Sequence, residues 1–144
     1  MTYVDALRTT LAAEHAAVYV YGALGAQTSQ SAEPTLYADI GSAYSEHRAR
    51  RDQLVGMILD ESGEPVAAEP AYDLPADLST PDLVMRRALR LEKSCAETYA
   101  YLVANSPPEQ RRWAVNALVM TAVRELAFRG TPEIFPGSDE YADR

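Results

Sequence analysis

The sequence predicts an all-α protein, an antiparallel four-helix bundle with one long crossover between its second and third helices. Four segments carry apolar residues at helical spacing, and capping or helix-stopping residues bound each of them. Short links inside the first and second helix pairs force antiparallel neighbours, whereas the link between the pairs is long. The 144 residues, 47% hydrophobic and 24% charged, have the size and composition of one globular domain.

The first two helices are predicted over residues 2–24 and 34–62. Glycine adopts positive φ at little cost, so Gly25 and Gly63 are expected to end them. Pro34 suits the first turn of the second helix, because its missing N–H would have no partner there. The apolar stripes of both helices contain polar residues near the middle. The stripes are Val4, Leu7, Leu11, Glu14, Val18 and Tyr21, then Ile40, Tyr44, His47, Arg51, Leu54 and Ile58.

The third and fourth helices are predicted over residues 81–105 and 107–129. Thr80 is a capping residue before Pro81, and it indicates where the third helix begins. Ser106 and Glu109 have the spacing of a capping box for the fourth helix, and Gly130 is expected to end it.

The crossover, residues 63–80, contains prolines that forbid a continuous helix. Residues 64–78 would reach ~50 Å when extended at ~3.3 Å per residue. A helix of about 25 residues is only ~37 Å long, so the crossover can return along the whole bundle. Two hairpins joined in this way form a ferritin-like bundle. The chain, 1–144, is therefore predicted to be one ferritin-like domain, without internal repeats. In its tail, residues 131–144, Ile134 and Phe135 are expected to contact the bundle.

The net charge of −8 argues against nucleic acid and anionic membranes as partners. The sequence has no apolar run long enough for a membrane span, and its first residues lack a signal-peptide pattern. Its single cysteine, Cys95, has no partner for an internal disulfide and suits a reducing compartment. A cytoplasmic location is therefore expected.

Glu14, His47 and Glu92 interrupt the apolar stripes of three helices near their midpoints. Buried charges are costly unless they are paired or bind a metal, and helix midpoints lie at similar depth in a bundle. We therefore expect these side chains to converge. Carboxylate and imidazole groups are ligands of iron and manganese, which makes the three residues a candidate metal site.

The ligand set is incomplete for a di-metal centre, which takes a Glu-x-x-His pair from each of two helices. Here Glu14-His15 and Glu46-His47 are adjacent pairs, and neighbouring helical residues point about 100° apart. The fourth helix offers Glu125 only near its end. This incompleteness favours a network of buried polar pairs over one metal ion, and one ion over a di-metal centre. The further members of the predicted polar cluster are His15, Arg50 and Arg51.

Four segments resemble an actinobacterial ferritin-like family of unassigned function. They are residues 11–22 (LAAEHAAVYVYG), 47–52 (HRARRD), 71–75 (AYDLP) and 135–137 (FPG). The resemblance spans nearly the whole chain and implies a ferritin-like fold without an established reaction. It places these residues on the family's polar positions: Glu14, His15, His47, Arg50, Arg51 and Glu92.

Three functions follow as hypotheses, and the sequence leaves open whether the protein is an enzyme. The first is a ferritin-like bundle of unknown role, with a Glu/His/Arg cluster that holds an anion, one metal ion or nothing. The second is an iron- or manganese-dependent oxidoreductase, and the third is a helical protein–protein interaction module. A homodimer is expected because tyrosine-rich helix faces are typical of interfaces, here with Tyr19, Tyr37 and Tyr101.

Overall fold

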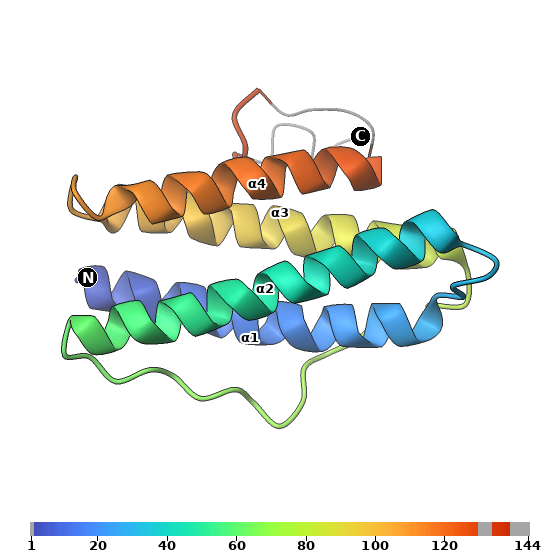
Figure 1. The fold of residues 1–144 in the computed structure, drawn as a ribbon, viewed down its shortest axis with the longest axis horizontal. Helices are drawn as coiled ribbons and strands as arrows, with labels where there is room; N and C mark the ends of the chain where they lie inside the picture. The colour runs from blue at the N-terminus through green and yellow to red at the C-terminus, as the bar shows by residue number, and fades with distance from the viewer. Residues whose placement is uncertain (1, 130–133, 139–144) are drawn as a thin grey trace.

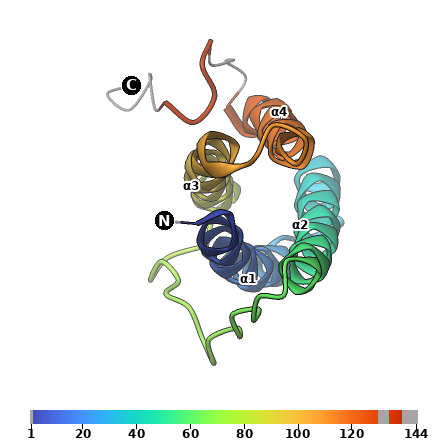
Figure 2. The same ribbon diagram turned by 90° about the vertical axis from the view of Figure 1, so that its left-hand side faces the viewer.

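Four helices form the molecule in the computed structural model, which describes residues 2–129 and 134–138. They are α1 (Tyr3–Gln27), α2 (Pro34–Asp60), α3 (Pro81–Asn105) and α4 (Arg111–Arg129) (Figure 1). The hairpins α1–α2 and α3–α4 pack together mainly through α1 and α3. The backbones of α2 and α4 lie farther apart on the other side of the ring (Figure 2). The predicted all-α four-helix bundle is confirmed.

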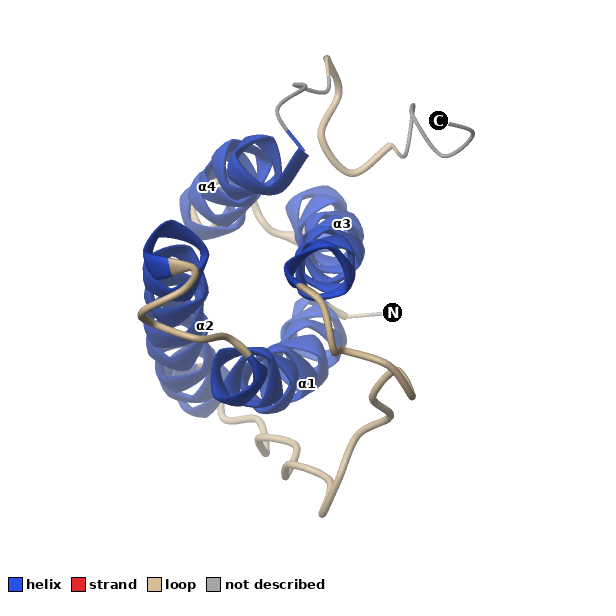
Figure 3. Ribbon diagram, turned by 90° about the vertical axis from the view of Figure 1, so that its right-hand side faces the viewer, coloured by secondary structure: helices blue, strands red, loops and turns tan. Residues whose placement is uncertain are grey.

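The crossover, residues 61–80, runs back along the first hairpin, so that α3 begins near the start of α2 (Figure 1). Neighbouring helices around the ring are therefore antiparallel, and the predicted long crossover is confirmed (Figure 3). Its contacts with the bundle are specific. Val66 and Leu78 pack against the apolar core, and the ring of Tyr72 lies 5.5 Å from that of Tyr19.

The helix starts follow the sequence signals except in α4. Thr2 forms a capping box with Asp5, and the Thr80 hydroxyl accepts a hydrogen bond from the Leu83 N–H at 3.3 Å. The hydroxyl of Ser106 instead donates to the Leu102 carbonyl of α3 at 2.6 Å. Ser106 therefore does not cap α4, which begins at Arg111 rather than at residue 107.

The ends of α1 and α2 differ from the glycine signals, and Gly130, expected to end α4, lies outside the described residues. α1 continues through Gly25 to Gln27, and the Thr28 hydroxyl donates to the Leu24 carbonyl at 2.7 Å. After α2 the left-handed residue is Ser62, with φ 58°, rather than Gly63. A Cβ on Gly63 would lie 2.7 Å from Val4 Cγ1. Gly63 thus permits close packing of the crossover on α1.

The tail makes a different contact from the one predicted. Ile134 and Phe135 are 74% and 69% exposed. The backbone at Gly137 instead lies against α3, where an added Cβ would be 2.9 Å from the Ala96 carbonyl oxygen. The other tail residues, 131–133 and 139–144, lie outside the described residues. None of the described helices combines the length and apolarity that a membrane span requires.

The core consists of two apolar clusters at opposite ends of the bundle. One contains Leu24, Ile40 and Val84, and the other contains Leu7 and Ile58. A layer of charged and hydroxyl side chains lies between these clusters. This polar layer contains the candidate site.

Candidate functional site

Glu14, His47 and Glu92 meet in the centre of the polar layer, and each is 0% exposed. They come from α1, α2 and α3, respectively. His47 Nδ1 lies 2.6 Å from Glu14 Oε2, and His47 Nε2 lies 3.0 Å from Glu92 Oε1. The imidazole therefore bridges the two carboxylates with its two ring nitrogens.

Two buried tyrosines hold the same carboxylates reciprocally across the hairpins. The hydroxyl of Tyr99, on α3, donates to Glu14 on α1. The hydroxyl of Tyr21, on α1, donates to Glu92 on α3 at 2.5 Å. The Tyr21 ring also stacks on His47, with 5.3 Å between the ring centroids. Each hairpin thus supplies a hydroxyl donor to the glutamate of the other.

Two guanidinium groups extend the network to α4. Arg50 Nη1 donates to the hydroxyls of Tyr99 and Thr121, each at 2.9 Å. Glu46 lies between Arg50 and Arg124 and accepts a hydrogen bond from both. Arg124 Nε also lies 3.7 Å from Glu92 Oε1. The second hairpin therefore contributes a cation where a metal centre would need a ligand.

The surroundings of His47 favour its charged form. Burial alone would lower the pKa of His47, but the hydrogen bonds and negative charges of Glu14 and Glu92 outweigh it and raise this pKa to about 9. Burial would raise the pKa of Glu92, whereas His47, Tyr21 and Arg124 lower it below the usual value. The arrangement is therefore an imidazolium between carboxylates.

The tyrosines and the cysteine stay protonated. Burial, followed by the charge of Glu92, raises the pKa of Tyr21 well above its usual value. Burial and Glu14 do the same for the pKa of Tyr99. Burial likewise raises the pKa of the Cys95 thiol, with smaller contributions from Glu14 and Glu92. The tyrosines thus act as hydrogen-bond donors, and Cys95 has none of the thiolate character that reactivity requires.

Two residues of the predicted polar cluster lie outside the layer. His15 Nε2 is 3.0 Å from the Val66 carbonyl oxygen, so this half-buried ring attaches the crossover to α1. Arg51 pairs with its neighbour Asp52 at 2.8 Å near the surface. Arg50, by contrast, is inside the layer and 5% exposed, and Glu125 of α4 is 1% exposed.

The polar layer shows an internal repeat that the sequence reading missed. The same number of residues along the chain separates Glu14 from Glu92, Tyr21 from Tyr99 and His47 from Glu125. All six side chains are buried, and α1 and α3 are each 25 residues long with ends at the same interval. The repeated spacing of glutamate and tyrosine on the first and third helices is the signal that could have revealed it. The sequence reading also did not include these residues in the site: Tyr21, Glu46, Tyr99, Thr121 and Arg124.

The polar layer does not fit the di-metal centre considered from the sequence. Arg124 approaches Glu92, and the two nitrogens of His47 are directed at different carboxylates. Glu14, Glu46 and Glu92 are already paired with cationic side chains. These side chains are His47, Arg50 and Arg124. Within residues 2–129 and 134–138, no group of three or more His, Cys, Asp or Glu side chains is arranged for a metal ion.

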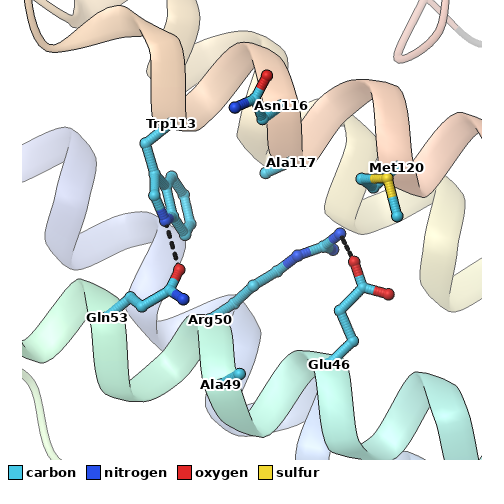
Figure 4. Close-up of a pocket in the computed structure, with 8 residues that line it drawn as sticks. All are labelled: Glu46, Ala49, Arg50, Gln53, Trp113, Asn116, Ala117 and Met120. Atoms are coloured by element: carbon cyan, nitrogen blue, oxygen red, sulfur yellow. Dashed lines mark hydrogen bonds and ion pairs between the residues drawn. The ribbon is translucent and has the colours of Figure 1, made fainter.

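A cleft between α2 and α4 opens onto one side of the layer (Figure 4). Its volume is about 250 Å³. The guanidinium of Arg50 projects into this cleft from α2, with Trp113 and Met120 on the α4 side. Trp113 Nε1 donates to Gln53 Oε1 at 2.6 Å. The cleft thus combines the ion pair between buried Arg50 and half-buried Glu46 with an aromatic and a thioether wall.

Comparisons with known proteins place the chain in a family without an assigned function. The crystal structure of a conserved hypothetical protein, Rv2844, from Mycobacterium tuberculosis is similar, with a TM-score of 0.79 and 28% sequence identity. The match covers 88% of this chain and 87% of that chain. A search of the curated proteins gives no significant match. The model of a domain of unknown function, DUF4439, matches residues 6–140, and the chain therefore belongs to the DUF4439 family.

Proposed function

We propose that this protein is a ferritin-like bundle that binds a small organic carboxylate in the cleft between α2 and α4. In this proposal the polar layer is a metal-independent support for the cleft. The observation that carries it is the position of Arg50, whose guanidinium is buried in the polar layer and also lines the cleft. A carboxylate ligand is favoured because guanidinium groups bind carboxylates with matched, charge-assisted hydrogen bonds.

Arg50 is held in place by the protein and still has hydrogen-bond donors for a ligand. Among the described residues, Tyr99, Thr121 and Glu46 accept hydrogen bonds from it. These bonds use three of the five N–H groups that a guanidinium offers. The fixed position lowers the entropy cost of binding, because the side chain is already ordered.

The walls of the cleft favour an anion with a flat apolar body. Trp113 and Met120 supply an aromatic and a polarisable surface, and Ala49 and Ala117 leave space between the helices. Asn116 and Gln53 at the cleft add amide groups that can donate to further oxygens. An aromatic monocarboxylate matches both the cation and the walls.

Fluorescence of the single tryptophan, Trp113, tests this proposal directly, because it lines the cleft. Benzoate is titrated into the protein, beside neutral benzamide and cationic benzylamine. We expect a saturable change with benzoate alone, at a dissociation constant of about 1 mM or lower, as suits a ligand of this size. The change should be lost in Arg50→Gln.

Arg48→Gln is the matched control, because Arg48 lies on the same helix but rests on the Tyr44 ring outside the cleft. It should bind benzoate as the wild type does. Circular dichroism establishes that the Arg50 variant is folded. Benzoate binding that persists in folded Arg50→Gln, or equal responses to benzoate and benzamide, would refute the proposal.

Binding of a single iron or manganese ion by Glu14, His47 and Glu92 is the second candidate, and one observation favours it. Glu92 Oε2 is buried and has no hydrogen-bond partner among the described residues, and such an atom often marks a missing water or ion. Elemental analysis of protein purified without chelator, beside His47→Ala, distinguishes the candidates. About one ion per chain, absent from the variant, would favour this candidate; metal-free wild type that binds benzoate would exclude it.

A further inference from the structure

Exposed apolar side chains are concentrated on α4 and the segment that follows it. Monomeric proteins rarely expose such a group together, and a helix that is apolar on several faces is usually covered. The inward face of α4, including Ala114 and Phe128, is buried in the bundle. The outward side chains, 38–74% exposed, are Val115, Val119, Met120, Val123, Leu126, Ile134 and Phe135.

The internal repeat shows that the fold itself does not require this apolar face. When the second hairpin is aligned on the first at the interval of this repeat, five α2 residues fall at the positions of the five exposed apolar residues of α4. All five α2 residues are exposed too, yet none is aliphatic. In the order of the α4 residues, they are Tyr37, Gly41, Ser42, Ser45 and Arg48. The same place in the bundle thus tolerates polar and small residues.

We propose that the outward face of α4 is a dimer interface, on which α4 of a second copy packs antiparallel about a two-fold axis. A two-fold interface brings one patch onto itself, so the patch must be self-complementary. The row Val115, Val119, Val123 and Leu126 meets this condition because it contains no charge. The tyrosine faces considered from the sequence are weaker candidates, since Tyr19 already packs on Tyr72.

The size of the face suits a reversible dimer. α4 has 19 residues, which corresponds to a length of about 28 Å. Two such helices would bury roughly 500 Å² per partner, near the lower limit for a specific interface. The dimer is therefore expected to dissociate in the micromolar range rather than to be obligate.

The α4 helices of two copies carry the same positive charge, so the attraction between them must come from their apolar side chains. Four arginines and one glutamate lie on this helix, whereas the whole chain has a net charge of −8. At physiological salt the repulsion between exposed charges is screened over about 8 Å.

Sedimentation velocity from about 1 to 500 µM tests the proposal on the full chain. The double variant Val123→Ser plus Leu126→Arg places on α4 the residues that α2 has at the equivalent positions. Neither change alters helix propensity much, so the variant should keep the wild-type circular dichroism. We expect a concentration-dependent wild-type dimer, and at least a tenfold weaker association in the variant. Leu59→Ser, at a 57% exposed position on α2, should dimerise as the wild type does.

Cysteine cross-linking tests the two-fold arrangement separately. Val119 lies near the middle of α4, so Val119→Cys should form a disulfide with itself across the axis. Cys95 does not compete, because it is 2% exposed. Leu59→Cys is the control and should cross-link much more slowly. A wild type that stays monomeric to 500 µM, undiminished association of the double variant, or equal cross-linking of the two cysteine variants would overturn the proposal.

Discussion

At the scale of single residues, His47 is the titratable group on which the polar layer depends. The pKa of His47 is about 9 in the folded protein, compared with about 6.5 for an exposed imidazole. The folded state therefore binds this proton more tightly than the unfolded state. The resulting stabilisation is fully present below about pH 6.5 and is lost as the pH rises through about 9.

The free energy of unfolding should accordingly fall by about 3 kcal/mol between pH 6.5 and 10, from the His47 titration alone. Urea unfolding measured across this range checks the prediction. Cysteine and tyrosine side chains also ionise in the unfolded chain at high pH. The difference between the wild type and His47→Gln isolates the histidine, and parallel pH profiles of the two proteins would contradict its assignment as an imidazolium.

The two reciprocal tyrosines give a second prediction at this scale. Tyr21→Phe and Tyr99→Phe each remove a donor from a buried carboxylate, which should destabilise the protein by about 1.5–3 kcal/mol. Tyr99→Phe should cost more, because the Tyr99 hydroxyl also accepts from Arg50. Denaturant unfolding measures both effects. Tyr19→Phe is the control, since Tyr19 is 39% exposed, and equal values for all three variants would contradict the described network.

At the scale of the helices, two glycines should respond oppositely to alanine. A Cβ at Gly63 would lie 2.7 Å from Val4 Cγ1 and 3.2 Å from the Ile58 carbonyl oxygen. Gly63→Ala should therefore destabilise by about 1–3 kcal/mol through overpacking. A Cβ at Gly56, inside α2, would meet nothing within 4 Å. Gly56→Ala should stabilise by about 0.5–1 kcal/mol. Thermal unfolding checks the pair, and changes of the same sign would contradict this packing.

Periodicity and prolines predicted all four helices, because these signals act locally and agree with one another. The details that could not be predicted depend on tertiary contacts, or on local alternatives that the sequence makes equally favourable. On a helix, the residues three and four positions after His47 both lie on the same face as His47. The sequence therefore could not decide between Arg50, which is buried in the layer, and Arg51, which pairs with Asp52. Ser106 could likewise cap α4 or bond back to α3, as it does.

The three central residues of the layer could be identified from the sequence, because charged residues stand out in apolar stripes and the midpoints of the helices lie at similar depth in the bundle. These residues are Glu14, His47 and Glu92. The contribution of α4 could not be predicted, because Arg124 reaches Glu46 and Glu92 through a long side chain whose direction the backbone does not fix. The rings of Tyr21 and Tyr99 are buried, and helical spacing alone does not distinguish them from ordinary core residues. Only the structure shows that their hydroxyls meet the glutamates of the opposite hairpin.

At the scale of the whole molecule, the crossover decides which hairpin surfaces meet. α2 has 27 residues and is therefore about 40 Å long, so the crossover must span about this distance for α3 to start beside the start of α2. Only this direction of α3 relative to α1 places Tyr99 of α3 at Glu14 and Tyr21 of α1 at Glu92. The length of the crossover is thus a condition for the polar layer.

Shortening the crossover should therefore disrupt the layer, whereas lengthening it should not. Without residues 68–77, the rest of the crossover reaches roughly 36 Å even when fully extended, less than α2 requires. A duplication of residues 68–77 should cost only about 0.5 kcal/mol in loop entropy. Thermal unfolding measures both, with Tyr72→Ala as the control for the lost Tyr19 contact. A deletion variant as stable as Tyr72→Ala would show that the hairpins can meet without the full crossover, against the topology argued here.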